Sequence, residues 1–318
     1  MAAVDCGTNS TRLLLAGPDG ATLERRMVIT RLGRGVDEER RLAEEAMVRS
    51  LDVLAGFRAL IDDVGASRAR AVATSAVRDA ANGQEFLDRA AAVLGVRPEL
   101  LTGQAEGALS FRGATSGLDP ADGPFLVVDV GGGSTELVLG GGPRADPVAV
   151  SIDIGCVRLT ERFLVSDPPH PSELESGRGA LRSLLLSAAR QLDALAAHAA
   201  TGAAEGGGEL RIAGARRLIG LAGTVSTAAV LDAGAASYRR EIVHHRLLRR
   251  DRVQALLERL AGMDHASRLR VPGLEPERAD VIVGGLLVLV AVMDHFGFDD
   301  LLASEADILD GIVIGLLE

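Results

Sequence analysis

Two stretches of the chain repeat one pattern of hydrophobic and polar residues. Each has a short apolar run, a turn containing Gly, Ser and Thr, and a second apolar run; they read VDCGTNSTRL at 4–13 and VDVGGGSTEL at 128–137. The copies align without a gap at an offset of 124 residues, which is 128 minus 4. Apolar runs on both sides of such a turn predict strand, tight turn and strand. The pattern therefore predicts two β-hairpins of one design.

Short strands alternate with helical periodicity in the rest of the chain. Apolar residues recur at helical spacing over 42–64, where Gly65 is placed to end the helix. Further strands are expected at 21–29, 70–76, 96–101, 148–154, 218–222 and 301–303. Of the further helices expected, one ends at about 94, and two begin at Thr102 and at Gly223. Three more are expected over about 172–200, over 281–293 and over 307–317. This alternation indicates an α/β fold.

A polar segment rich in chain-breaking residues lies directly before the second predicted hairpin. It reads GLDPADGP at 117–124 and is typical of a hinge between domains. A chain of 318 residues is long enough for two domains. We expect a first domain over 1–121, a second over 122–303, and a terminal helix at about 304–318 that packs back on the first. An Ala/Gly-rich stretch at 201–208 is expected to be a surface loop.

The charged residues narrow the classes of ligand. All 34 basic residues are Arg, so a Walker-type nucleotide loop, which needs its Lys, is excluded. A net charge of −10 argues against general affinity for nucleic acid or an anionic membrane. Aromatic residues make up 3% of the chain, so few side chains are available to stack on nucleic-acid bases. A polyphosphate ligand would have to be held locally by Arg, backbone amides and metal.

Several features of the sequence favour a cytoplasmic location. Asp5 interrupts any apolar leader at once, and the longest apolar run, 281–293, is shorter than the ~18 residues that suggest a membrane span. Cys6 and Cys156 are too few for a disulfide framework or a zinc site. We expect both cysteines to be buried and the apolar run to form a core helix.

The composition of the two turns favours phosphate binding. Gly at the bend lets a ligand approach the backbone, and consecutive N–H groups beside Ser and Thr hydroxyls form a concavity that binds anions. Asp5 and Asp129 end the preceding strands, where a hydrated Mg²⁺ bound to phosphate would lie. A single hairpin with such a turn is also common in proteins as an ordinary turn that binds no phosphate. Two copies in register favour a duplicated phosphate site.

Other polar residues follow predicted strands or open predicted helices. Arg78 and Asn82 follow the strand at 70–76, as ligand contacts or as helix caps. Glu106 lies one residue beyond the position of a reciprocal cap for Thr102, so capping does not explain it. Gly223 and Thr224 open a helix whose free amides could bind an anion. The Arg residues of 239–252 form either a solvated helix face or a surface that receives a polyanion.

Seven segments in order along the chain resemble the exopolyphosphatase and guanosine pentaphosphate phosphohydrolase (Ppx/GppA) family, a branch of the actin-like ATPase superfamily. They are VDCGTNSTR, ATSAVRDAAN, TGQAEGALSFRG, VDVGGGSTEL, DIGCVRLTERF, LAGTVST and VPGLEPERADVIVGG. The resemblance implies two ribonuclease-H-like domains flanking a cleft, in a short two-domain form. It also implies Mg²⁺-dependent, or Mn²⁺-dependent, hydrolysis of a terminal phosphoanhydride.

The resemblance further implies roles for individual residues. Glu106 falls on the family's catalytic Glu, which positions or deprotonates the attacking water. Glu136 is assigned with it as catalytic, and Asp5 and Asp129 are assigned to the metal. The phosphate-binding residues implied in the two loops are Gly7, Thr8, Asn9, Ser10 and Arg12, and Gly131, Gly132, Gly133, Ser134 and Thr135. Arg78, Gly223 and Thr224 are added to them as candidates from their positions.

The predicted substrate is inorganic polyphosphate, because few aromatic residues are available to recognise a base. Short chains are expected, because longer members add a C-terminal helical extension that this chain lacks. Guanosine pentaphosphate, cleaved at its 5′ γ-phosphate, is the second candidate. A regulator that binds an alarmone without turnover is a third reading, which the retained carboxylates disfavour. Ala105 replaces an acid that relatives carry before the catalytic Glu. Relatives are often dimers, so a homodimer is possible here.

Overall fold

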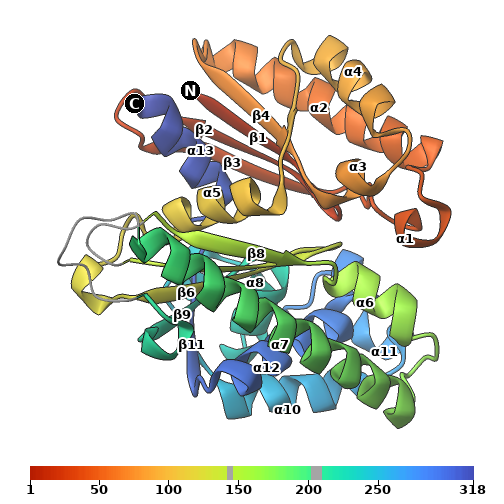
Figure 1. Cartoon of the computed structure of the whole chain (residues 1–318). Coiled ribbons are helices and arrows are strands. Elements are labelled where there is room, and N and C mark those ends of the chain that lie inside the picture. The colour runs from red at the N-terminus through yellow and green to blue at the C-terminus, as the bar shows by residue number, and fades with distance from the viewer. Residues whose placement is uncertain (142–145, 202–209) are drawn as a thin grey trace. The chain divides into compact units, whose positions relative to one another are not determined.

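The computed structural model describes residues 1–141, 146–201 and 210–318 (Figure 1). The predicted loop at 201–208 lies, apart from the backbone of Thr201, outside the described residues. The chain divides into two compact units, 1–113 with 307–318 and 114–306. These bounds lie beside the domain limits expected from the sequence, 1–121 with about 304–318 and 122–303.

The first unit is built on a five-stranded mixed sheet. Its strands are β1 (Ala2–Cys6), β2 (Ser10–Ala16), β3 (Thr22–Ile29), β4 (Ala69–Ala73) and β5 (Glu99–Leu100), in the order β3-β2-β1-β4-β5. β2 pairs antiparallel with both β1 and β3. On the other side of β1, β4 pairs parallel with β1 and β5 pairs parallel with β4. The predicted strand at 96–101 is reduced to two residues.

Helices cover both faces of this first sheet (Figure 1). They are α1 (Val36–Glu39), α2 (Glu44–Val64), α3 (Ser75–Asp79), α4 (Gly83–Leu94), α5 (Gly103–Thr115) and α13 (Ile308–Leu317). Alternate residues of β1 point to opposite faces, so Val4 joins the core under α2 and α4 while Ala3 joins the core under α13. A Cβ on Gly311 would lie 2.0 Å from the carbonyl oxygen of Leu109, so only Gly lets α13 approach α5 this closely.

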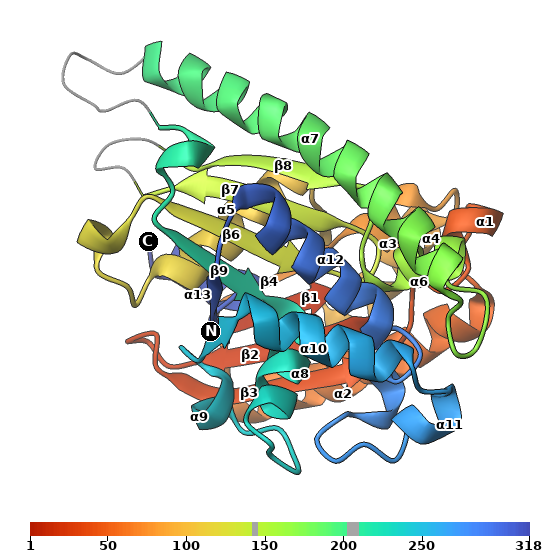
Figure 2. The ribbon, with the colours of Figure 1, turned by 90° about the horizontal axis from the view of Figure 1, so that it is seen from below.

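The second unit is built on a six-stranded mixed sheet. Its strands are β6 (Phe125–Val130), β7 (Thr135–Gly140), β8 (Val148–Ile152), β9 (Arg217–Leu221), β10 (Leu247–Arg249) and β11 (Asp300–Ala303), in the order β10-β11-β9-β6-β7-β8. Its helices are α6 (Cys156–Phe163), α7 (Pro171–Thr201), α8 (Ala222–Asp232), α9 (Arg240–Val243), α10 (Arg250–Ala261), α11 (His265–Arg268) and α12 (Ile282–Phe296). Figure 2 shows α12 alongside α10.

The apolar run at 281–293 forms α12, and nearly all of its side chains are buried in the core of this unit. The expected core helix is therefore confirmed. None of the helices in the described part of the chain is long and apolar enough to cross a membrane. Cys6 and Cys156 are both buried free thiols, as expected.

The two sheets share one strand order. In each sheet three strands form an antiparallel meander, and the first of these strands also pairs in parallel with a strand that follows a helical crossover. The shared order is β3-β2-β1-β4-β5 in one unit and β8-β7-β6-β9-β11 in the other. This is the ribonuclease-H-like arrangement, and it confirms the predicted α/β fold of two such domains. Strand β10 extends the second sheet beyond the shared pattern.

Candidate active site

The turn of the first hairpin, residues 7–9 (the first loop), is anchored through its carbonyl groups. Amides in the segment 30–33 donate hydrogen bonds to the carbonyl oxygens of Thr8 and Asn9, with N···O distances of 2.8 to 3.0 Å. The Thr8 hydroxyl lies 2.8 Å from the Ser75 hydroxyl at the start of α3. The neighbouring segment and α3 thus fix the loop.

The turn of the second hairpin, residues 131–133 (the second loop), is anchored in the same way by a different element. The first amides of α6, residues 156–158, donate to the carbonyl oxygens of Gly131 and Gly132 at 2.9 to 3.2 Å. A Cβ on Gly155, directly before α6, would lie 2.4 Å from the Gly131 oxygen. The absence of a side chain at Gly155 therefore lets α6 dock on the loop.

Both loops keep amide groups for an external acceptor. In the portions that the structure describes, the N–H groups of Thr8, Asn9, Gly132 and Gly133 donate no hydrogen bond. Consecutive unused amides in a turn form a site for anions. Gly7, Ser10, Gly131 and Ser134 close the two turns through Gly N–H to Ser C=O bonds of 3.0 Å. The use of both loops for phosphate stays a prediction.

Asp5, at the end of β1, is held by Arg12 of β2. The Arg12 Nε and Nη2 atoms donate to Asp5 Oδ2 at 2.9 and 2.6 Å, and Arg12 Nη1 donates to Asp307 Oδ2 at 2.6 Å. The second oxygen, Asp5 Oδ1, has no hydrogen-bond partner among the described residues and is buried. Burial raises the pKa of the Asp5 carboxyl, and Arg12 offsets part of that rise.

The ion pairs of Arg12 change how its predicted role must be read. All three of its nitrogens donate to carboxylates, and its side chain is 17% exposed. Its use as a phosphate ligand therefore stays a prediction that competes with a role in holding Asp5. Asp307, the N-cap of α13, was not among the predicted site residues, because its contact with Arg12 spans 295 positions of sequence.

Glu106 lies in the first turn of α5, next to Arg78. Arg78 Nη1 donates to the carbonyl oxygen of Leu101 at 2.9 Å and lies 3.6 Å from Glu106 Oε2. The structure therefore brings these two predicted residues together. The Thr102 hydroxyl accepts the amide of Ala105 at 3.2 Å, so the helix is capped without help from Glu106.

Asn82 has a structural role in this neighbourhood. It precedes α4, yet its side chain does not cap that helix. Its Oδ1 accepts the amide of Leu42 at 2.8 Å and its Nδ2 donates to the Leu42 carbonyl oxygen at 3.0 Å. Both ends of the side-chain amide are thereby used to fix the segment before α2.

Asp129 and Glu136 stand opposite each other in the second hairpin. The register of β6 and β7 pairs them directly, and their exposures are 8% and 1%. Ser151 donates its hydroxyl to Glu136 Oε1 at 2.8 Å. Like charges directly across a sheet are destabilising unless a cation or proton is shared. The equivalent pair in the first hairpin is Asp5 with Arg12, so only the second hairpin carries two acids there.

Thr135, the remaining predicted residue of the second hairpin, is fully buried and donates its hydroxyl to the carbonyl oxygen of Ile154 at 2.6 Å. It braces the hairpin against the segment before α6. Its side chain is therefore engaged inside the fold, and phosphate contact through that hydroxyl stays a prediction that would need this bond to break.

Gly223 and Thr224 lie in the first turn of α8, next to a buried Arg that the sequence did not single out. A Cβ on Gly223 would lie 1.8 Å from Arg278 Nη1, so the guanidinium rests on the glycine. Arg278 Nε donates to Glu275 at 2.6 Å. Ala222, at the turn from β9 into α8, has a φ of 69°. A strained turn, a buried cation and a helix start are features of a ligand site.

The Arg residues of 239–252 are mostly engaged with carboxylates of the second unit. Arg246 and Arg252 bond to Asp232, Arg249 to Asp251, and Arg250 to Asp294. This pattern favours the reading of a solvated, ion-paired face over that of a surface receiving a polyanion.

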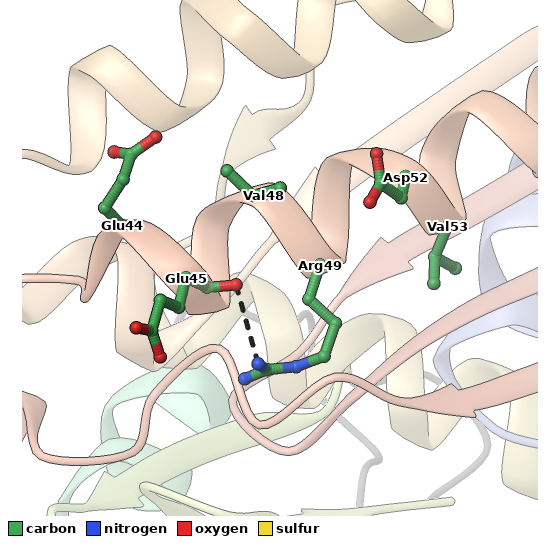
Figure 3. Close-up of a pocket in the computed structure, with 6 residues that line it drawn as sticks. All are labelled: Glu44, Glu45, Val48, Arg49, Asp52 and Val53. Atoms are coloured by element: carbon green, nitrogen blue, oxygen red, sulfur yellow. Dashed lines mark hydrogen bonds between the residues drawn. The ribbon is translucent and has the colours of Figure 1, made fainter.

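A surface hollow over α2 contains none of the predicted site residues (Figure 3). It is lined by Glu44, Glu45, Val48, Arg49, Asp52 and Val53. Arg49 donates to the backbone oxygens of Thr30 and Glu45, and three of the other lining residues, Glu44, Glu45 and Asp52, carry carboxylates. A hollow of this charge does not suit a polyphosphate.

The docking of α6 on the second loop makes Gly155 a test of that loop's function. We expect Gly155→Ala to displace the loop and to lower the turnover of substrate about 10²-fold, since a shift of about 1 Å in positioning groups can cost that much. Phosphate-release kinetics would measure it. Gly179→Ala on α7, where a Cβ meets no atom within 4 Å, is the matched control and should keep wild-type rates. Equal rates in both variants would contradict the role of the loop.

Comparison with known proteins agrees with this geometry. The Ppx/GppA phosphatase family matches residues 19–318. The chain is 40% identical to exopolyphosphatase 2 of Mycobacterium tuberculosis, over 99% of this chain and 98% of that protein. It is 30% identical to the guanosine-5′-triphosphate,3′-diphosphate pyrophosphatase of Vibrio vulnificus, over 99% of this chain but 59% of that protein.

A solved structure shows the same fold over the same length. The PPX-GPPA enzyme of Aquifex aeolicus superimposes with a TM-score of 0.77 at 30% identity, covering 99% of this chain and 98% of that one. Sequence and fold therefore agree over nearly the whole chain, and the protein is a member of the Ppx/GppA phosphatase family.

Proposed function

We propose that the protein is an exopolyphosphatase that releases terminal phosphate from inorganic polyphosphate by hydrolysis. The observation that carries the proposal is the 40% identity to an exopolyphosphatase over 99% of this chain and 98% of that protein. The two loops with unused amides support it, because polyphosphate offers successive anionic groups and each loop can bind one.

The first unit would supply the group that acts on water. In the proposed reaction a water oxygen forms a bond to the terminal phosphorus while the bridging P–O bond breaks, and Glu106 accepts the water proton. Phosphoryl transfer depends mainly on positioning and charge neutralisation. Arg78, 3.6 Å from Glu106, would orient that carboxylate and contribute positive charge.

The carboxylates fit a divalent cation such as Mg²⁺ or Mn²⁺. Asp5 has a buried oxygen without a hydrogen-bond partner among the described residues, and Asp129 faces Glu136 across the sheet. The described residues include no group of three or more His, Cys, Asp or Glu that could hold a metal. Mg²⁺ usually binds through one or two carboxylates plus phosphate and water, so such a group is not required. When bound, the metal would neutralise charge on the phosphoryl oxygens.

Guanosine pentaphosphate is the second candidate substrate. The relative named for this nucleotide is 30% identical to the chain, whereas the exopolyphosphatase is 40% identical. Low aromatic content also leaves little to stack a base. Both observations favour polyphosphate.

Phosphate release measured side by side from short polyphosphate, long polyphosphate and guanosine pentaphosphate, with Mg²⁺, tests the proposal. We expect release from polyphosphate, with the short chains used best. Release from the nucleotide alone would move the assignment to alarmone conversion. Binding of either substrate without release would instead support a regulator that has lost turnover.

A further inference from the structure

Five charged side chains of the first unit form one connected cluster that includes Asp5. Asp5, Asp307 and Asp310 supply three carboxylates, and Arg12 and Arg25 supply two guanidinium groups. The side chains come from β1, β2, β3 and the start of α13, so positions up to 295 residues apart meet here. The cluster therefore connects the last helix of the chain to a predicted metal ligand.

Each carboxylate in the series of contacts offers one oxygen to the partners that hold it and the other oxygen onward. Asp307 Oδ1 accepts the Leu309 amide at 2.9 Å and Arg25 Nη1 at 3.3 Å. Its other oxygen, Oδ2, accepts Arg12 Nη1 at 2.6 Å. Arg12 also donates Nε and Nη2 to Asp5 Oδ2, and Asp5 Oδ1 has no hydrogen-bond partner among the described residues. We call this series of contacts, from Arg25 to Asp5 Oδ1, the Asp5 relay.

The backbone at the start of α13 is fixed from two sides. Asp310 Oδ2 accepts the Asp307 amide at 2.8 Å and also binds Arg25 Nη2. A Cβ on Gly113 of α5 would lie 1.9 Å from the Asp307 carbonyl oxygen, so α5 packs directly on this helix start. Because its backbone is held in this way, Asp307 can respond to a lost partner mainly through its side chain.

The charges of the cluster leave a place for a cation. Three carboxylates face two guanidinium groups, so one negative charge is in excess when all five groups are ionised. A buried charge is costly unless it is paired. A divalent cation at the buried oxygen Asp5 Oδ1 would supply the compensating charge.

We propose that Arg25 is a positioning residue, which orients Asp5 for a divalent cation through the Asp5 relay. The inference rests on the proposed binding of that cation by Asp5. Without Arg25, the carboxylate of Asp307 would lose the cation at its Oδ1 and would draw Arg12 away from Asp5. Loss of a group that orients a metal ligand lowers metal affinity by about 10- to 100-fold.

The alternative interpretation is that Arg25 only stabilises the fold and has no effect on the metal site. A test must also separate position from charge, because removal of a cation by itself would strengthen the binding of another cation. Removing Arg25 together with Asp310, its other ion-pair partner, leaves the net charge unchanged. Asn at position 310 keeps an oxygen that can accept the Asp307 amide.

Binding of Mn²⁺ to the whole protein without substrate, followed by electron paramagnetic resonance of the free ion, tests the proposal. We expect Arg25→Met/Asp310→Asn to raise the Mn²⁺ dissociation constant by about tenfold or more. In an Asp5→Asn background the same double change should have no further effect, because the relay ends on Asp5. A role in folding alone would not depend on the residue at position 5.

Glu24→Gln/Arg26→Met is the matched control. These residues flank Arg25 on β3, so their side chains point to the other face of the sheet, where they form an ion pair with each other. The control removes one acid and one base, as the test variant does. Because the Arg26 side chain is 57% exposed, its ion pair contributes little, and the control should bind Mn²⁺ like the wild type.

Three results would each overturn the role of Arg25. They are an unchanged or lower dissociation constant in the test variant, an equal rise in the control, and a rise that persists in the Asp5→Asn background. Circular dichroism would report whether the test variant folds. If it does not, Arg25→Lys is the second variant: its single nitrogen cannot replace both bonds to Asp307 and Asp310, so a smaller rise that also vanishes with Asp5→Asn is expected.

Phosphate release from polyphosphate, measured on the same proteins, separates this inference from the proposed function. A wild type that releases phosphate but binds Mn²⁺ equally well with Asp5→Asn would contradict the relay and leave the hydrolase standing. A wild type that binds Mn²⁺ in an Arg25-dependent way but releases no phosphate would contradict the proposed function and leave the relay standing.

Discussion

Glu106→Gln is expected to lower the rate of phosphate release by about 10²- to 10⁴-fold, the usual cost of removing a general base. Gln keeps the size and the hydrogen-bonding reach of Glu but cannot accept the proton of the attacking water. Because Thr102 caps α5 through Ala105, the helix start does not depend on the carboxylate. The variant should therefore fold normally and still bind polyphosphate.

Glu99→Gln provides the control for this prediction. Glu99 lies on β5, close in sequence to Glu106, and its carboxylate forms an exposed ion pair with Arg70. Such pairs contribute little to stability, so its loss should change neither rate nor fold. A Glu106→Gln enzyme with more than a tenth of the wild-type turnover would remove Glu106 from the proton-transfer step.

The parts of this site that depend on local sequence were predictable. A turn of Gly, Ser and Thr between two apolar runs specifies a hairpin by itself, so both loops could be placed without a structure. The resemblance to the Ppx/GppA family implied two ribonuclease-H-like domains, and the two sheets do share that strand order. Glu106 was identified because its spacing from Thr102 does not fit a capping box, and the cap does form without it.

The parts that depend on distant contacts were not predictable. Arg12 has two carboxylate partners, and one of them, Asp307, belongs to the last helix. The sequence left open whether the Arg residues of 239–252 form a solvated face or receive a polyanion, because Asp232 and Asp294, which pair with three of them, lie outside the stretch. No periodicity encodes such pairings, because they are fixed only when the sheet brings the segments together.

Arg12→Met is expected to destabilise the first unit by about 3–5 kcal/mol, the range found when one partner of a buried ion pair is removed. Met keeps much of the length and apolar character of the Arg side chain, so the loss would come from charge and not from a cavity. Asp5 and Asp307 would then be buried with less compensation. Urea denaturation followed by circular dichroism would measure the free energy of unfolding.

The pH dependence of Arg12→Met separates this role from phosphate binding. Arg12 and Arg25 hold the pKa of Asp307 below its usual value despite burial, so in the wild type its stabilising contribution is present at neutral pH and is lost as the pH falls through that lowered pKa. Without Arg12, both carboxyls should have higher pKa values. Their buried charge would be relieved by protonation as the pH falls, so the deficit relative to the wild type should shrink towards acid pH.

Arg12→Lys completes the comparison. Lys keeps the charge, but its single ammonium nitrogen cannot replace the planar fork of three guanidinium nitrogens that bond to Asp5 and Asp307. We therefore expect a smaller loss of stability than with Met. If Arg12 served only as a phosphate ligand, both variants would keep wild-type stability at every pH and would differ from the wild type only in a higher KM. A loss of stability at neutral pH that diminishes in acid would instead identify Arg12 as the residue that keeps Asp5 in position.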